Sequence, residues 1–245
     1  MPRPIFPFLW PILTGGLALF CQAGDSSPPT PPVHTFSIVA RDPQTGEIGI
    51  AVESRIVAVG AIVPHAMAGV GAVATQALAN VAFGPAALSL LGTGTPPDQV
   101  LARFQRQDSG MDHRQIAILP AAGPPVAFTG KDCSAAAGHL TFPDFTVQGN
   151  LLASHEVLPA MAKAFQAAPG LLEDRLIAAL RAGQQAGGDR RGRQSAALLI
   201  VREGWGYGGA NDRYRDLRVD DHPEPIEELA RILELHRRLF PRPAD

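Results

Sequence analysis

The sequence predicts an α+β domain in which two stacked, antiparallel-rich sheets carry helices on their outer faces. Its elements come in blocks of strands, helices, strands, helices, strands and a last helix, without the strict alternation of a doubly wound parallel sheet. Several strands are apolar along their whole length, which is typical of strands buried on both faces. With 245 residues, 46% of them hydrophobic, the chain can bury one complete core. We expect a single domain over residues 35–240 and a short tail at 241–245.

The N-terminal residues predict an export signal followed by a spacer. Arg3 gives residues 1–23 a basic start, and the apolar stretch FLWPILTGGLALF is too short and too often broken by proline and glycine for a membrane span. Small residues around Ala23 suit signal peptidase, while Cys21 leaves a lipidated leader as an alternative. Residues 24–34 form a proline-rich linker. We expect a periplasmic or secreted protein without a stable membrane span; the alternative is a cytosolic protein with a later start site.

The first part of the domain is predicted to be rich in strands. TFSIVAR and IGIAVES flank DPQTGE, whose Asp-Pro start and Gly46 suit a tight turn. The apolar runs IVAVGAIV and VGAVATQ continue the pattern. The expected strands are residues 35–41, 48–54, 56–63 and 70–76.

Helices follow, and then further strands. FGPAALSLLGTG ends in glycines, whereas TPPDQVLARFQRQD begins with threonine and proline, so the first suits a helix end and the second a helix start. RQIAILP and PPVAFTG indicate a strand pair, and FTVQGN a shorter strand. The expected helices are residues 83–94 and 95–108, and the strands are residues 114–120, 124–130 and 145–150.

The last part combines amphipathic helices with two strands. Apolar residues recur at helical spacing in three segments, and each therefore predicts a helix with one buried face. SAALLIVRE predicts a buried strand and YRDLRVD its partner; the final helix is expected to begin at HPEPIEEL. The residues expected to face inward are Val157, Leu158, Met161, Ala162 and Phe165, then Leu172, Leu176, Ile177 and Leu180, and finally Ile226, Leu229, Ile232, Leu233 and Leu239.

Two polar segments interrupt the apolar chain, GGDRRGRQSAALLIV and GGANDRYRDLRVDDHPEPIEEL. They place arginines and aspartates at strand ends, where arginine forks suit a bidentate hold on a carboxylate or phosphate. The alternative is a set of ion pairs that only fixes loops. The candidate substrate-binding residues here are Asp189, Arg190, Arg191, Arg193, Asp212 and Arg213.

A second group of candidates lies where strands end. In ATQALAN, the hydroxyl of Thr75 and the amides of Gln76 and Asn80 have the chemistry to stabilise an oxyanion or orient a substrate. Helix capping by Thr75 or Asn80 is the alternative. VQGN adds Gln148 and Asn150 in a similar position.

Composition and spacing argue against several other classes of site. The net charge of -2 does not suit a polyanionic partner, so we expect no nucleic acid. GVGAVA matches a dinucleotide-binding pattern only formally, because no acidic residue follows at the required distance. Asp220, Asp221 and His222 could hold a metal, although an ion pair and a helix cap explain them more simply. Cys133 has no adjacent base. We expect neither a cofactor nor a metal.

Thr35 is the strongest candidate nucleophile. A threonine hydroxyl needs a base, and an N-terminal threonine carries one in its own α-amino group, which titrates near pH 8. In this sequence a signal and a spacer precede Thr35. The nucleophile therefore requires cleavage of the bond between His34 and Thr35; otherwise Thr35 is only the first residue of a strand.

The segments TFSIVARDPQTGEIGIAVES, GVGAVATQALAN, VQGNLLA, GGDRRGRQSAALLIV and YGGANDRYRDLRVDDHPEPIEEL together resemble the domain-of-unknown-function 1028 family, which is placed in the N-terminal-nucleophile (Ntn) hydrolase superfamily. The resemblance runs from Thr35 to about Leu239. It implies a four-layer αββα sandwich and hydrolysis of amide bonds, with no established substrate.

Three functions remain open. The first is an exported Ntn-type amidohydrolase acting on a small amide or peptide, with Thr35 as nucleophile and Thr75, Asn80 or backbone amides stabilising the oxyanion. The second is a non-catalytic small-molecule-binding protein on the same fold. The third is a metal-assisted hydrolase centred on Asp220, Asp221 and His222. The apolar sheets and final helix also permit a homodimer.

Overall fold

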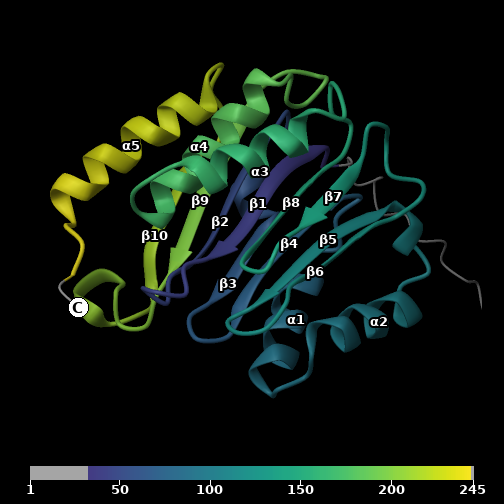
Figure 1. The fold of residues 1–245 in the computed structure, drawn as a ribbon, viewed down its shortest axis with the longest axis horizontal. Helices are drawn as coiled ribbons and strands as arrows, with labels where there is room; N and C mark the ends of the chain where they lie inside the picture. The colour runs from purple at the N-terminus through teal and green to yellow at the C-terminus, as the bar shows by residue number, and fades with distance from the viewer. Residues whose placement is uncertain (1–32, 244–245) are drawn as a thin grey trace, which may run out of the picture. The chain divides into compact units, whose positions relative to one another are not determined.

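The computed structural model describes residues 33–243, which belong to one compact unit extending from Pro31 to Asp245. The predicted signal peptide and the linker up to residue 32 lie outside the described residues. Within the described part, the chain forms two antiparallel sheets and five α-helices (Figure 1).

The larger sheet has six strands in the order β10-β9-β2-β1-β8-β7. Its centre is the predicted hairpin, in which Thr35 pairs with Ser54 at one end and Arg41 with Ile48 at the other. The last residue of β2 is thereby placed beside the first residue of β1. The six strands are β1 (Thr35–Arg41), β2 (Ile48–Ser54), β7 (Gly138–Thr141), β8 (Phe145–Gly149), β9 (Ser195–Val201) and β10 (Arg213–Val219).

The smaller sheet has four strands in the order β3-β4-β5-β6. Its long strands are the two apolar segments predicted near residues 70 and 114. The four strands are β3 (Pro64–Met67), β4 (Gly71–Ala77), β5 (Arg114–Pro120) and β6 (Val126–Thr129).

The two sheets face each other and the helices cover their outer faces, which gives four layers (Figure 1). Side chains such as Val39, Ile50 and Ala74 form the core between the sheets. α3 (Val157–Ala167), α4 (Leu172–Gln185) and α5 (Pro225–Leu239) pack on the larger sheet, while α1 (Phe83–Gly92) and α2 (Pro97–Gln107) pack on the smaller one. The predicted α+β class with two antiparallel sheets and outer helices is confirmed.

The alternation of a strand explains why β1 is buried along almost its whole length. Phe36, Ile38 and Ala40 point toward the helices, whereas Val39 points into the core between the sheets. Thr35 and Ser37 share the face of Val39. Both hydroxyls therefore lie between the two sheets, where polar groups need partners.

Three sequence-based expectations about elements were wrong. Residues 56–63 do not form a strand: they form a loop with a short 3-10 turn at Val59–Ala61, and they are apolar because Val59 and Val63 are buried in the core between the sheets. β7 was missed, since its short edge sequence GHLT has no apolar alternation. Leu239, expected to face inward, is 64% exposed at the last position of α5.

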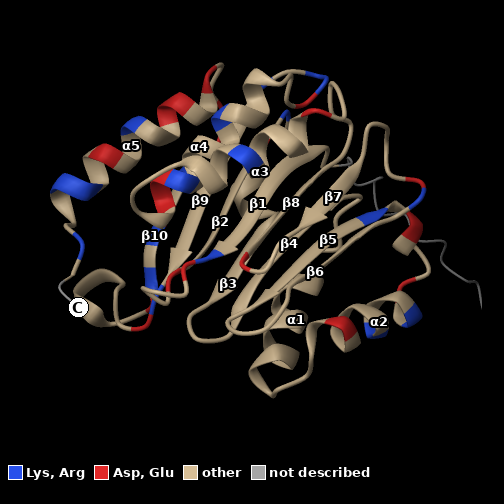
Figure 2. Cartoon of the chain, in the orientation of Figure 1, with Lys and Arg blue, Asp and Glu red and all other residues tan. Residues whose placement is uncertain are grey.

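Charged residues lie mainly on the outer helices and in the loops, and most strands have few of them, with β10 (RYRDLRV) as the exception (Figure 2). None of the described helices has the length and apolar character needed to cross a membrane.

Candidate functional site

Thr35 lies at the start of β1 with no exposed surface. Its hydroxyl is within donating distance of two acceptors, the carbonyl oxygen of Val33 at 3.0 Å and Ser54 Oγ at 3.2 Å. A hydroxyl has one proton, so it donates to one of the two at a time. The hairpin register brings Ser54 to Thr35, because the two strands have equal length and no bulge.

The carbonyl oxygen of His34 receives two side-chain donors. Ser54 Oγ donates a short hydrogen bond to it, and Arg191 Nη2 donates another at 2.9 Å. This carbonyl belongs to the peptide bond that joins His34 to Thr35. Two donors on one carbonyl oxygen polarise it and would stabilise negative charge developing there.

Asp189 aims the Arg191 side chain at His34. Its carboxylate accepts hydrogen bonds from Arg191 Nε at 3.1 Å and Arg191 Nη2 at 2.7 Å, and the Arg191 backbone amide donates to it at 2.9 Å. Asp189 is 2% exposed. Gly188 and Gly192, with φ of 58° and 110°, flank this loop in backbone conformations that favour glycine. The bidentate pair fixes the orientation of the guanidinium.

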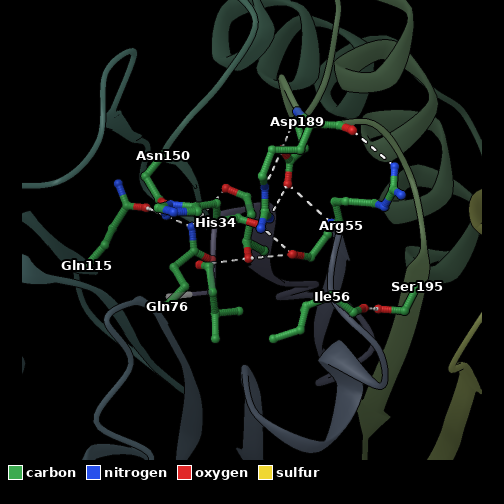
Figure 3. A network of polar contacts seen from close by, with 12 residues as sticks. His34, Arg55, Ile56, Gln76, Gln115, Asn150, Asp189 and Ser195 are labelled. Atoms are coloured by element: carbon green, nitrogen blue, oxygen red, sulfur yellow. Dashed lines mark hydrogen bonds and ion pairs between the residues drawn. The ribbon is translucent and has the colours of Figure 1, made fainter. Parts of the chain in front are cut away.

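The buried amide side chains of Gln76, Gln115 and Asn150 form a network close to His34 (Figure 3), and this network holds the carbonyl of Thr35. The backbone amide of Asn150 donates to the Thr35 carbonyl at 3.0 Å, and Gln76 Nε2 lies 3.4 Å from it. Gln76 Nε2 and Asn150 Nδ2 both donate to Gln115 Oε1, at 2.8 and 3.0 Å. All three amide side chains are fully buried. The network therefore ties β4, β5 and the end of β8 to the start of β1.

Glu53 is a buried carboxyl group that precedes Ser54 on β2, and its side chain lies on the opposite face of the strand. Burial raises its pKa well above the ordinary value of 4.5, and the nearby charge of Asp189 raises it further. Arg193, the Gln194 backbone amide and Arg191 act in the opposite direction. The Gln194 amide lies close, but neither carboxylate oxygen of Glu53 has a hydrogen bond of ordinary geometry. Glu53 is therefore held in its protonated form into a higher pH range than an exposed glutamate.

Left-handed backbone conformations gather around the same strand ends. The non-glycine residues with positive φ in the described part of the chain are Ala58, Ala77 and Leu151, at 57°, 67° and 52°. Ala77 pairs with Val33, and Leu151 follows Asn150. Such conformations cost free energy and cluster at functional sites, so they independently mark this end of the sheets.

The structure brings only some of the sequence candidates to Thr35. Thr75 lies on β4 with its hydroxyl donating to the Asn80 carbonyl at 3.2 Å, and neighbouring Val73 packs toward α1 and α2. The Asn80 side chain caps Ala82 and donates to Asp108. Thr75 and Asn80 therefore have structural contacts on the outer face of the smaller sheet, whereas Gln76 points inward to Thr35.

The arginine candidates are also divided between two places. Asp212 and Arg213 lie at the end of the larger sheet opposite to Thr35, where Arg213 pairs with Val201. Arg213 forms an ion pair with Asp216. Arg190 is exposed. Arg193 pairs with Glu224. Of the predicted group, Asp189 and Arg191 reach the His34–Thr35 bond.

An open depression of about 490 Å³ lies at the Thr35 end of the larger sheet. Arg55, which directly follows Ser54, donates from Nη1 to the Arg191 carbonyl at 3.1 Å and connects the depression to the network. The depression is lined by Arg55, Arg193, Gln194, Asp221, His222 and Pro223.

The part of the chain that the structure describes contains no group of three or more His, Cys, Asp or Glu side chains placed to hold a metal ion. Asp221 Oδ1 accepts from Gln194 at 3.1 Å, and His222 Nδ1 accepts from the Glu224 backbone amide at 3.0 Å. These contacts fix the loop before α5.

Sequence reasoning missed four residues of this site. Ser54 could have been found, because equal hairpin strands place the last residue of one beside the first of the other. Gln115 is a lone amide in the apolar segment RQIAILP, which also signals an inward polar group. Glu53 and His34 carry no comparable signal, since their roles depend on neighbours distant in sequence.

Comparison with known proteins agrees with the extent of this domain. The model of a family of unknown function, DUF1028, matches residues 35–229. The crystal structure of a DUF1028 protein from Silicibacter pomeroyi is similar over 83% of this chain and 86% of that chain, with 34% sequence identity and a TM-score of 0.76. No curated protein matches the chain.

Proposed function

We propose, from the premise that the chain belongs to the DUF1028 family, that it is an exported amidohydrolase of the Ntn type in which Thr35 becomes the N-terminal nucleophile. Its substrate would be a small amide or peptide. The four layers of two antiparallel sheets between helices agree with the αββα arrangement of that superfamily. No cofactor or metal takes part in the proposed reaction.

The observation that carries the proposal is the pair of donors on the His34 carbonyl oxygen, one bond before a buried threonine. A peptide carbonyl directly before the first residue of a strand has no structural need for both a serine and a charge-assisted arginine. Thr35 itself has no exposed surface while residues 33 and 34 cover it. Cleavage at His34–Thr35 would both use the donors and uncover the nucleophile.

The proposed first step is an intramolecular acyl shift. Thr35 Oγ1 adds to the His34 carbonyl carbon while its proton passes to Ser54 Oγ, and the Ser54 proton passes to the His34 oxygen. The C–N bond then breaks while the proton on the His34 oxygen passes to the Thr35 nitrogen. The carbonyl re-forms, the nitrogen becomes an amine, and an ester joins His34 to Thr35 Oγ1. Water hydrolyses the ester to a His34 carboxylic acid and a free Thr35 hydroxyl.

The mature site would apply the same groups to a substrate. The α-amino group of Thr35, neutral in part near pH 8, accepts the hydroxyl proton as Oγ1 attacks the substrate carbonyl. Ser54 and Arg191 donate to the oxyanion. The amine then protonates the leaving nitrogen, and water releases the acyl group.

The test is the intact mass of the full chain after expression with export. We expect the wild-type and Thr35→Ser chains to begin at residue 35, and the Thr35→Ala chain to keep Gly24–His34. p-Nitrophenyl acetate should acylate the mature wild-type chain at residue 35. A wild-type chain that begins at Gly24, with the same amidase activity in Thr35→Ala, would contradict the proposal.

Binding without catalysis is a second candidate, favoured by the open depression that Arg55 and Arg193 line. These arginines suit a small anionic molecule. In that case the chain would retain the residues before Thr35, and Thr35→Ala would bind ligand as the wild type does.

A further inference from the structure

We propose that Val33 and His34 occupy the acyl-side subsites of the mature site, so that the substrates are extended peptides with a small branched aliphatic side chain in the second position before the cleaved bond. This inference rests on the proposed function, because the subsites open only when residues 1–34 leave. Val33–His34 is then the first substrate of the site, built into the chain.

The second subsite, filled by Val33, is formed as a strand partner. Val33 and Ala77 exchange both backbone hydrogen bonds of an antiparallel bridge, and the Ala77 amide donates to the Val33 carbonyl at 2.9 Å. The Val33 side chain is 2% exposed and belongs to the core between the sheets. A substrate here would form main-chain hydrogen bonds with Ala77 at the end of β4, and its side chain would occupy the space that Val33 fills.

The first subsite, filled by His34, combines a side-chain contact with the reacting carbonyl. The imidazole Nδ1 lies 2.8 Å from Asn150 Oδ1, with the ring nitrogen as donor. The carbonyl oxygen meets Ser54 Oγ and Arg191 Nη2. Asn150 is fully buried and its Nδ2 is committed to Gln115, so the orientation of its amide is fixed. The first subsite therefore favours a side chain that donates a hydrogen bond.

Departure of residues 33 and 34 leaves these groups without their partners. The Ala77 amide and carbonyl, Asn150 Oδ1 and a valine-sized apolar space would all lose contacts. A polar group that stays buried without a partner is unfavourable. A peptide that pairs with Ala77 and fills the valine space restores the contacts, whereas a charged side chain there would bury an unpaired charge.

The experiment compares coumarin amides of short peptides on the mature protein purified after cleavage of the full chain. The reference is acetyl-Pro-Val-His-7-amino-4-methylcoumarin, and the matched substrates carry Asp in place of Val, or Ala in place of His. p-Nitrophenyl acetate serves as an acyl donor too small to use the subsites.

We expect kcat/KM to fall at least about 100-fold for the Asp peptide and about 10-fold for the Ala peptide, because each change leaves a buried group unpaired. Asn150→Leu should lower kcat/KM for the His peptide more than for the Ala peptide. The product acetyl-Pro-Val-His should inhibit competitively, and the Asp-containing product should not.

Two results would overturn the inference, and they differ in whether the proposed function survives. Equal kcat/KM across the peptides, with Thr35 acylated by p-nitrophenyl acetate, refutes the subsites and leaves the nucleophile in place. Failure of p-nitrophenyl acetate to acylate Thr35, or a chain that is not cleaved at His34–Thr35, refutes the proposed function and the inference with it.

Discussion

The Arg191 guanidinium donates a 2.9 Å hydrogen bond to the carbonyl oxygen of His34, across 157 positions of sequence. Asp189 holds that guanidinium with two side-chain contacts, and Ser54 donates to the same oxygen. The order β9-β2-β1 within the sheet makes this meeting possible, because the loop before β9 and the end of β2 lie beside the start of β1.

Replacing Arg191 tests whether this hydrogen bond serves cleavage. Arg191→Met should slow cleavage of His34–Thr35 by about 100-fold, the effect of removing one donor from an oxyanion. Arg191→Lys should be intermediate, since lysine keeps the charge but not the fork held by Asp189. Time courses of intact mass after synthesis of the chain measure the rate.

Arg190→Met is the matched control, because Arg190 is an exposed arginine in the same loop. It should cleave at the wild-type rate. Equal slowing in both variants would assign the effect to the loop and not to the donor.

Ser54→Ala should also slow cleavage by about 100-fold or more, since it removes both the donor to His34 and the proposed carrier of the Thr35 proton. Ser195 is the comparison: it pairs with Ser54 in the sheet, but it accepts from the Val59 amide and donates to the Ile56 carbonyl. Ser195→Ala should cost about 1–3 kcal/mol of unfolding free energy and leave the cleavage rate near that of the wild type. Cleavage of Ser54→Ala at the wild-type rate would refute the relay.

Gln115→Leu should lower the unfolding free energy by at least about 2 kcal/mol, because its buried partners lose their hydrogen bonds. Gln115 Nε2 has two protons and lies 2.8–2.9 Å from three acceptors, Thr129 Oγ1 and the Gly138 and Gly149 carbonyls, so it donates to two of them at a time. Its Oε1 accepts from two further amides. Gln105→Leu, on the exposed side of α2, should change stability by less than about 0.5 kcal/mol. Urea unfolding of both variants measures the difference; equal effects would show that the network contributes nothing specific.

Glu53→Gln should change how stability depends on pH. Burial and Asp189 raise the pKa of Glu53 in the folded chain well above 4.5, so the folded chain keeps a proton that the unfolded chain loses above that pH. This contribution is complete below about pH 4.5 and is lost progressively as pH rises toward the folded-state pKa. The amide variant does not ionise.

Relative to the wild type, Glu53→Gln should therefore gain stability as pH rises from 5 to 8. Unfolding curves of the two proteins at each pH give the difference, in which all other titrating groups cancel. A difference that stays constant with pH would show that Glu53 titrates as it does in the unfolded chain.

The errors of the sequence analysis have one physical origin: each depends on contacts between segments that are distant in sequence. Residues 56–63 were expected to form a strand because they are apolar, but they are apolar because they are buried in the core and not because they pair as a strand. Thr75 and Gln76 are adjacent in sequence, yet the alternation of β4 sends only Gln76 toward Thr35. Arg191 and Arg213 belong to similar polar segments, but antiparallel pairing places them at opposite ends of the sheet.

By itself the sequence determined the central hairpin, most strands and helices, the α+β class and Thr35 as the residue in question, since apolar periodicity and turn residues act over a few positions. Only the tertiary structure decided that Ser54, Asp189 and Arg191 converge on the carbonyl before Thr35, and that Val33 pairs with Ala77. These contacts depend on strand order and register, which are set by the packing of two whole sheets and leave no local mark on the chain.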